Sequence, residues 1–145
     1  MSERTVFQAV SRRHIVSAGP GATVHNAACV MTQAGCGSIL IIDSGGSLLG
    51  ILTERDLMTR VLAKALDPAT TLVTQVMTPR PQCVGPEMKV ADAVLIMIER
   101  GFRHLPVVSG NKILGVFSAR DALPREMNTA ESLAEFNDLA NDALG

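Results

Sequence analysis

The chain has 145 residues, 47% of them apolar, which suffices for one domain or two small halves with a sizeable core. Its formal net charge is −1 and only 3% of its residues are aromatic, so neither electrostatic attraction nor stacking favours a nucleic-acid partner. Three cysteines without metal-type spacing argue against a disulfide framework and a zinc site. Without an apolar leader or a bilayer-length apolar run, we predict a cytoplasmic protein with no membrane partner.

The first pattern along the chain is a repeat. The segment 5–11 resembles 72–78, and each is followed by a Gly-Pro pair, at 19–20 and 85–86. We interpret both segments as lead-ins to two copies of one structural unit.

A helix is predicted next in each copy. Apolar residues recur at positions i, i+3, i+4 and i+7 from Val24 to Met31, with Thr23 as the N-cap and Gly35 as the stop. The same spacing recurs from Val90 to Met97 and stops at Gly101.

Two strands follow each helix. The segment 38–43 is apolar and β-branched, as in a strand covered on both faces. Its counterpart, 104–109, contains Pro106, which places it at a sheet edge or confines the proline to the start of the strand. Hairpin-like turns then lead into strands at 48–52 and 113–117.

Each second strand runs into the motif Gly-apolar-apolar-[Thr/Ser]-x-x-Asp, at 50–56 and 115–121. Thr53 and Ser118 are good helix N-caps, because a hydroxyl accepts a hydrogen bond from a free amide of the first turn. The Asp three residues later can bond back to the amide of the cap residue. Helix capping alone would explain this motif.

The same atoms also suit a ligand. A helix N-terminus with a hydroxyl and free amides binds phosphate, and a nearby carboxylate, Asp56 or Asp121, can accept bonds from ribose hydroxyls. Arg55 and Arg120 lie at the positive ends of the helix dipoles, which is unfavourable without an anion nearby. A solvated charge is the alternative interpretation for both arginines.

The repeats differ after the motif. In the first, we predict a helix that ends at 67–68 and has one apolar face, formed by Met58, Val61, Leu62 and Ala65. In the second, Pro124 should cut or kink the helix. We therefore divide the chain into repeat 1 with its N-terminal lead-in (1–70), repeat 2 (71–127) and a C-terminal helical tail (128–145).

These elements predict an α/β (α+β) fold of tandem repeats. Each repeat would be helix, strand, strand and helix around a small sheet. One unit of this size buries too little apolar surface to be stable alone. We expect the two units to pack sheet to sheet around a shared core, with an approximate two-fold axis between them.

The doubled motif, the preceding helix, the apolar strand and the Val-Met-Thr lead-in at 76–78 resemble a cystathionine-β-synthase (CBS) domain pair, or Bateman module. The resemblance covers roughly residues 5–127. It implies two clefts between the repeats that bind adenosine-containing ligands such as AMP, ADP, ATP or S-adenosylmethionine, and in some members NAD(H). It also implies a disc-like homodimer that regulates an attached enzyme, channel or transporter or acts as a stand-alone protein.

The resemblance assigns roles to residues. The two motif aspartates would hold ribose, and the motif hydroxyls of Thr53 and Ser118 would face phosphates. Basic residues before the first strand of a repeat would also meet phosphate. These are Arg103 and His104 in repeat two, whereas repeat one has uncharged residues at 37–38, so we expect unequal clefts. The adenine would lie against the repeat starts and two motif residues, namely Ser17, Ala18, Cys83, Val84, Ile51 and Val116.

Our specific hypothesis places the ribose at Asp121 and the phosphates near Ser118, Arg120, Arg103 and His104. The repeats share both clefts, so Arg103 serving a ligand held by Asp56 is the alternative. His104 would add charge below about pH 6.5.

The predicted function is a stand-alone regulatory CBS pair that binds a ligand of the AMP/ADP/ATP class and signals to an unknown regulated protein. The chain shows no nucleophile with a local base and no metal spacing, so we expect no enzymatic activity and no required cofactor. A homodimer would form through the apolar faces of the helices beginning at Val24 and Val90. The alternatives are a ligand-free interaction module that docks on a partner, and a sensor of S-adenosylmethionine or NAD(H).

Overall fold

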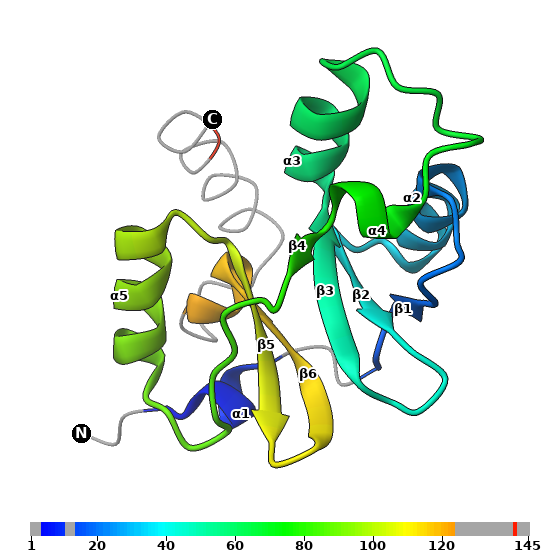
Figure 1. The fold of residues 1–145 in the computed structure, drawn as a ribbon. Coiled ribbons are helices and arrows are strands. Elements are labelled where there is room, and N and C mark those ends of the chain that lie inside the picture. Colours follow the sequence, from blue (N-terminus) through cyan, green and yellow to red (C-terminus); the bar gives the residue numbers. More distant parts are fainter. Residues whose placement is uncertain (1–3, 11–13, 124–140, 142–145) are drawn as a thin grey trace.

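The computed structural model describes residues 4–10, 14–123 and 141, which form two lobes (Figure 1). The first lobe is built on a four-stranded sheet of order β1-β2-β3-β4, and the second on the two-stranded sheet β5-β6. The strands are β1 (Ser17–Ala18), β2 (Ser38–Ile42), β3 (Leu48–Thr53), β4 (Thr78–Pro79), β5 (His104–Ser109) and β6 (Lys112–Ser118). The helices are α1 (Val6–Ala9), α2 (Val24–Ala34), α3 (Glu54–Asp56), η1 (Leu57–Leu62), α4 (Val73–Val76), α5 (Val90–Arg100) and η2 (Ala119–Ala122).

The mixed α/β fold of two similar units is confirmed. Thr23 caps α2 by accepting a hydrogen bond from the Asn26 amide at 3.1 Å. Gly35 and Gly101 end α2 and α5 in the left-handed conformation, with φ of 66° and 74°, which favours glycine because other side chains clash there. Both predicted helices therefore start and stop where the sequence indicates. The predicted C-terminal helical tail and the effect of Pro124 lie outside the described residues.

In each repeat, the antiparallel strand pair (β2 with β3, or β5 with β6) places the start of the first strand beside the motif at the end of the second. Ser38 at the start of β2 pairs with Thr53, and His104 at the start of β5 pairs with Ser118. Pro106 lies inside β5, where its carbonyl accepts a hydrogen bond from the Val84 amide at 2.9 Å. On the side away from β6, β5 pairs among the described residues with Val84 alone, through a parallel bridge in which the Val108 amide also donates to the Val84 carbonyl at 2.9 Å.

The motif glycine Gly50 allows β4 to approach β3 closely. A Cβ atom at Gly50 would meet the Met77 side chain and would lie 2.8 Å from the Thr78 carbonyl oxygen. Because that contact is with backbone, the strands would have to separate to admit a side chain. Gly50 thus keeps the segment after α4 against the motif strand.

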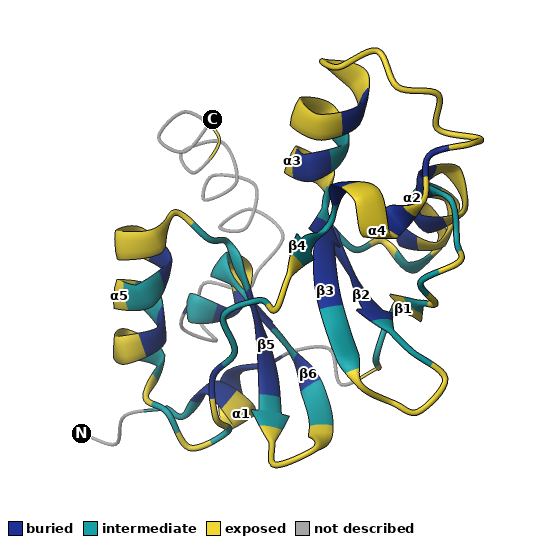
Figure 2. Ribbon diagram, viewed as in Figure 1, coloured by how far each residue is buried: buried dark blue, intermediate teal, exposed yellow. Residues whose placement is uncertain are grey.

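The described apolar residues form two cores rather than one shared core, and the lead-ins are exchanged between them. Val6 and Ala9 of α1 pack in the second lobe with Leu105 and Phe117. The second lead-in, α4, packs in the first lobe with α2 and β2. Figure 2 shows the buried face of each lobe turned inward. The sequence groups each lead-in with the repeat that follows it, whereas the packing groups it with the other repeat.

This exchange is held by backbone hydrogen bonds as well as by apolar contact. The Val6 amide donates to the Met88 carbonyl at 2.7 Å, and the Val73 amide donates to the Ala22 carbonyl at 2.9 Å. Separating the two lobes would therefore cost both cores part of their buried surface.

The predicted helix after Thr53 needs correction. Only α3 is α-helical, and η1 is a π-helical turn in which the Ala63 amide bonds the Met58 carbonyl at 2.9 Å. Val61 is buried at 2% exposure, but Met58 and Leu62 are 53% and 70% exposed. The i→i+5 winding changes which residues share a face, so the predicted apolar face is wrong except at Val61.

Candidate functional site

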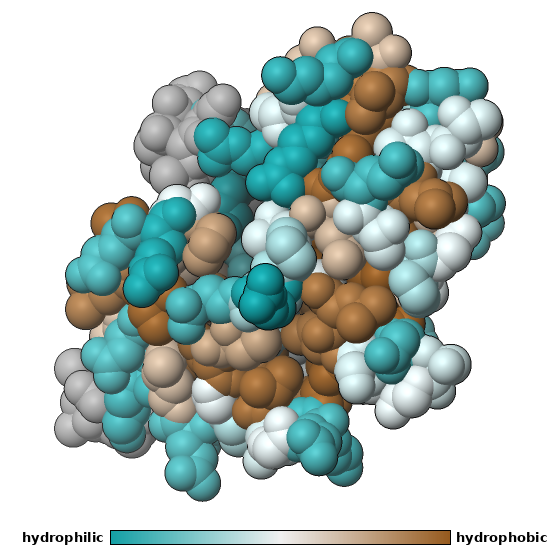
Figure 3. Space-filling model, viewed as in Figure 1, coloured by the Kyte–Doolittle hydropathy of each residue, from teal (hydrophilic) through white to brown (hydrophobic). Residues whose placement is uncertain are grey.

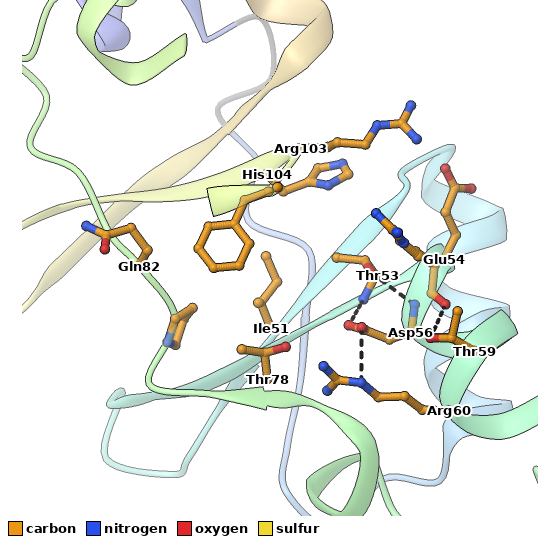
Figure 4. Close-up of a pocket in the computed structure, with 14 residues that line it drawn as sticks. Ile51, Thr53, Glu54, Asp56, Thr59, Arg60, Thr78, Gln82, Arg103 and His104 are labelled. Atoms are coloured by element: carbon orange, nitrogen blue, oxygen red, sulfur yellow. Dashed lines mark hydrogen bonds and ion pairs between the residues drawn. The ribbon is translucent and has the colours of Figure 1, made fainter. Parts of the chain in front are cut away.

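A cleft of about 240 Å³ lies where the two repeats meet (Figure 4). Its walls come from β3, α3 and η1 of the first repeat and from the start of β5. Pro81 and Gln82, in the segment 80–83 that follows β4 and is called the joining segment below, complete the wall. The lining residues are Ile51, Thr53, Glu54, Arg55, Asp56, Thr59, Arg60, Thr78, Pro81, Gln82, Gly101, Phe102, Arg103 and His104.

The first motif forms the floor of this cleft. The Thr53 amide donates to Asp56 Oδ2 at 3.0 Å, and the Asp56 amide donates to Thr53 Oγ1 at 3.2 Å. The predicted capping box is therefore present. Asp56 Oδ1 lies 3.6 Å from Arg60 Nε, and Arg60 Nη1 donates to the Val76 carbonyl at 2.9 Å. Asp56 thus uses one oxygen as a cap and presents the other beside Arg60.

Arg103 and His104 line the cleft on the side opposite Asp56, and Figure 4 shows the Arg103 side chain extending along that side, away from Asp56. A Cβ atom at Gly37 would lie 3.5 Å from His104 Nε2 and 3.1 Å from Glu54 Oε1. The contact with His104 would be an ordinary van der Waals contact, and only the end of the Glu54 side chain would have to shift by a few tenths of an ångström. Position 37, where the sequence lacks a charge, therefore lies beside both Glu54 and His104.

The pKa of His104 is lowered from its usual 6.5 to about 4. Burial is the main cause, followed by the neighbouring charge of Arg103, while Asp121 and Asp56 act in the opposite direction. This value corrects the expectation that His104 gains charge below about pH 6.5. At neutral pH the cleft holds a neutral imidazole, which can donate one hydrogen bond and accept another.

Arg103 and His104 lie between the two motifs: His104 pairs with Ser118, and the charge of Asp121 acts on its pKa more than that of Asp56 does, so the predicted grouping with Asp121 stays a prediction. Both line the cleft that contains Asp56, as in the alternative that the sequence left open. Asp121 is 6% exposed, and its Oδ2 accepts bonds from the Ser118 amide at 2.9 Å and the Ser118 hydroxyl at 3.2 Å. Ser118 and Asp121 form a second cap, and a second ligand held by these two residues and Arg120 stays a prediction.

Of the predicted site residues, the cleft brings together Thr53, Arg55, Asp56, Arg103, His104 and Ile51. It does not include the predicted base contacts Ser17, Ala18, Cys83, Val84 and Val116. The Cys83 thiol instead donates to the Pro81 carbonyl at 3.3 Å, and burial raises its pKa.

Sequence reasoning missed several lining residues, namely Glu54, Thr59, Arg60, Thr78, Pro81, Gln82, Gly101 and Phe102. Arg60 could have been found, because it lies four residues after Asp56, at the spacing of helical ion pairs. Phe102 and the joining segment reach the cleft only through the tertiary arrangement, so no local signal marks them.

Three arginines, Arg55, Arg60 and Arg103, face two carboxylates in this cleft. The set suits a molecule with an anionic group and hydroxyl donors, since guanidinium binds phosphate and carboxylate accepts from ribose. In the described part of the chain, no cluster of His, Cys, Asp and Glu could hold a metal ion, and no helix could cross a bilayer.

Comparison with known proteins identifies the class. The CBS domain model matches residues 7–63 and 73–127, so the chain belongs to the CBS domain family and forms a CBS pair, a regulatory module. An uncharacterised protein from Methanopyrus kandleri is 31% identical over 127 residues, covering 87% of this chain and 65% of that protein. A CBS domain-containing protein from Arabidopsis thaliana is 35% identical over 115 residues, covering 79% of this chain and 22% of that protein.

Solved structures agree in fold. A protein with CBS domains from Burkholderia ambifaria has a TM-score of 0.78 and 30% identity, covering 82% of this chain and 90% of that chain. The structure of CBSX2 in complex with AMP has a TM-score of 0.69 and 21% identity, covering 81% of this chain and 92% of that chain. This chain thus spans only part of the two curated relatives but nearly all of these CBS-domain structures.

Proposed function

We propose that this CBS pair binds an adenosine-containing ligand of the AMP/ADP/ATP class in the cleft at Asp56 and passes the resulting change of shape to a partner protein. The observation that carries the proposal is that the two repeats contribute complementary side chains to one cleft. A carboxylate suited to ribose comes from one repeat, and basic residues suited to phosphate come from both. A nucleotide in the cleft would therefore bridge the repeats.

The chemistry assigns each wall a part of the ligand. Asp56 Oδ1 would accept hydrogen bonds from ribose hydroxyls, while the Thr53 hydroxyl and the guanidinium of Arg103 would donate to phosphate. Phe102 and Ile51 add apolar surface to the same cleft, and we assign the base to them. CBSX2, whose structure contains AMP, supports the choice of ligand class.

Paired substitutions of the two caps test the proposal. Asp56→Ala and Asp121→Ala each remove a helix cap, but only Asp56 lines the described cleft. Calorimetry with AMP, ADP and ATP should show about tenfold or greater loss of affinity for Asp56→Ala, the effect of a charge-assisted hydrogen bond. Asp121→Ala serves as the control for capping and should retain the affinity of this cleft. Equal affinity in wild type and Asp56→Ala would contradict the assignment.

The phosphate assignment has its own test. Arg103→Ala should weaken AMP binding while leaving adenosine less affected, because adenosine has no phosphate for the guanidinium to hold. Titrations of both ligands into both proteins give the answer. Equal losses for the two ligands, or none for either, would show that Arg103 does not hold phosphate.

One observation favours a ligand-free interaction module. Both motif aspartates already serve as helix caps, so capping alone accounts for their presence. A thermal-shift panel of AMP, ADP, ATP, S-adenosylmethionine and NADH separates the alternatives, because a ligand that binds only the native state raises the melting temperature. No shift with any of the five would favour the interaction module. A shift with only S-adenosylmethionine or NADH would change the ligand class.

A further inference from the structure

Arg60 contacts two parts of the fold that the sequence keeps apart. Its Nε lies 3.6 Å from Asp56 Oδ1, and its Nη1 donates to the Val76 carbonyl at 2.9 Å, 16 residues away. Val76 is the last residue of α4, 5% exposed, and the chain then runs through β4 into the segment that joins the repeats. Figure 4 shows Arg60 beneath Asp56 at the floor of the cleft.

The Asp56 oxygen beside Arg60 is the one a ribose would use. Oδ2 is engaged by the Thr53 amide at 3.0 Å, so a hydroxyl donor entering the cleft meets Oδ1. Arg60 and the ligand therefore approach the same atom. Arg60 also sits in the π-helical turn η1, a wider winding that occurs preferentially at functional sites.

We infer that Arg60 is a positioning residue that couples occupancy of the cleft to α4. In the empty cleft, Arg60 ties Asp56 to the Val76 carbonyl. A ligand whose ribose takes Asp56 Oδ1 and whose phosphate attracts the guanidinium draws Arg60 away from Val76. The end of α4, and with it the entry to the joining segment, is then released. This inference rests on the proposed function, since it requires a nucleotide at Asp56.

Hydrogen exchange at the Met77 amide reports this step. That amide donates to the Val73 carbonyl at 2.9 Å, and Met77 does not line the cleft. Ligand binding usually slows exchange, so faster exchange is a distinctive signature. With the tightest binder among AMP, ADP and ATP at saturation, we expect exchange at Met77 to accelerate about tenfold, the factor that corresponds to one charge-assisted hydrogen bond.

Arg60→Lys is the matched variant. It keeps the positive charge near Asp56, but an ammonium group lacks the fork that reaches two acceptors in different directions. In this variant Met77 should exchange fast without ligand and should not respond to nucleotide. Arg100→Lys, which changes an exposed arginine at the end of α5 outside the cleft, should behave like wild type.

The outcomes separate the two proposals. If no nucleotide binds wild type by calorimetry, the proposed function and the coupling fail together. If nucleotide binds but wild-type exchange at Met77 is unchanged or slower, only the coupling is overturned. The coupling is also overturned if nucleotide still accelerates exchange at Met77 in Arg60→Lys.

Discussion

His104 is a neutral side chain in a cleft of charges. The sequence places it beside Arg103, as an apparent second cation, but burial and that neighbouring guanidinium lower its pKa to about 4. Two carboxylates, Asp121 of its own repeat and Asp56 of the other, act on the pKa in the opposite direction without restoring it. The charge state of His104 thus depends on residues of both repeats.

The lowered pKa of His104 predicts how stability varies with pH. Between about pH 6.5 and pH 4 the unfolded state binds this proton and the folded state does not, so stability is lost as the pH falls through that window. The shift in the pKa of His104 lowers the free energy of unfolding by at most about 3 kcal/mol across this window, since each unit of pKa shift corresponds to about 1.36 kcal/mol. Urea unfolding at pH 7 and pH 4.5 should show a smaller loss for His104→Gln than for wild type.

His25→Gln is the control for the pH experiment, because His25 is exposed on α2. Its loss of stability between the two pH values should equal that of wild type. An identical pH profile for His104→Gln and wild type would mean that His104 does not titrate in this window.

At the scale of elements, η1 is where local pattern and observed packing differ most. The sequence between residues 57 and 62 reads as an ordinary amphipathic helix. The structure winds it as a π-helical turn that buries Val61 and exposes Leu62. This winding brings Arg60 to both Asp56 and the Val76 carbonyl, so the irregular element contributes directly to the site.

Adjacent alanine substitutions test the π-helical register. Val61→Ala should cost about 2 kcal/mol of unfolding free energy, because Val61 is 2% exposed in the first core. Leu62→Ala should change it by no more than about 0.5 kcal/mol, because that side chain is 70% exposed. Chemical denaturation measures both. A larger cost at Leu62 would indicate that the segment winds as a regular α-helix in solution.

At the scale of the molecule, the interface of the proposed homodimer must be reconsidered. Val24, Met31 and Met97, expected at that interface, are instead buried in the two cores of the monomer. The apolar side chains left outside on α5 are Leu95 and Ile98, at 54% and 73% exposure. Figure 3 shows apolar surface along the outer side of α5 and between the lobes.

We therefore predict that a homodimer uses α5. Ile98→Glu should convert the dimer to a monomer at micromolar concentration without unfolding it, because the side chain is exposed within one chain and the new charge would be desolvated in the interface. Light scattering measures the mass. Val30→Glu places the same charge on α2, where the side chain is 37% exposed, and should leave the dimer intact. A monomeric wild type, or dissociation by Val30→Glu alone, would contradict this interface.

The sequence by itself determined the local elements and the family. The signals that predicted α2 and α5 correctly come from residues close together in the sequence. They are the hydrophobic periodicity, the N-cap Thr23 and the terminating glycines Gly35 and Gly101. The capping motif at Thr53 and Asp56 was equally local, because its donors and acceptors lie three residues apart. Doubling of these signals at nearly constant spacing indicated two similar units and the CBS resemblance.

Only the tertiary structure decided which residues of one repeat meet those of the other. Arg103 and Asp56 line one cleft, α1 packs on the second core, and His104 loses its charge, because each outcome depends on contacts between segments distant in sequence. The π-helical winding of η1 is likewise not marked by its local pattern, which favours a regular helix. Local propensities amount to tenths of a kcal/mol per residue, so tertiary burial of one apolar side chain, worth about 1.5–3 kcal/mol, overrides them.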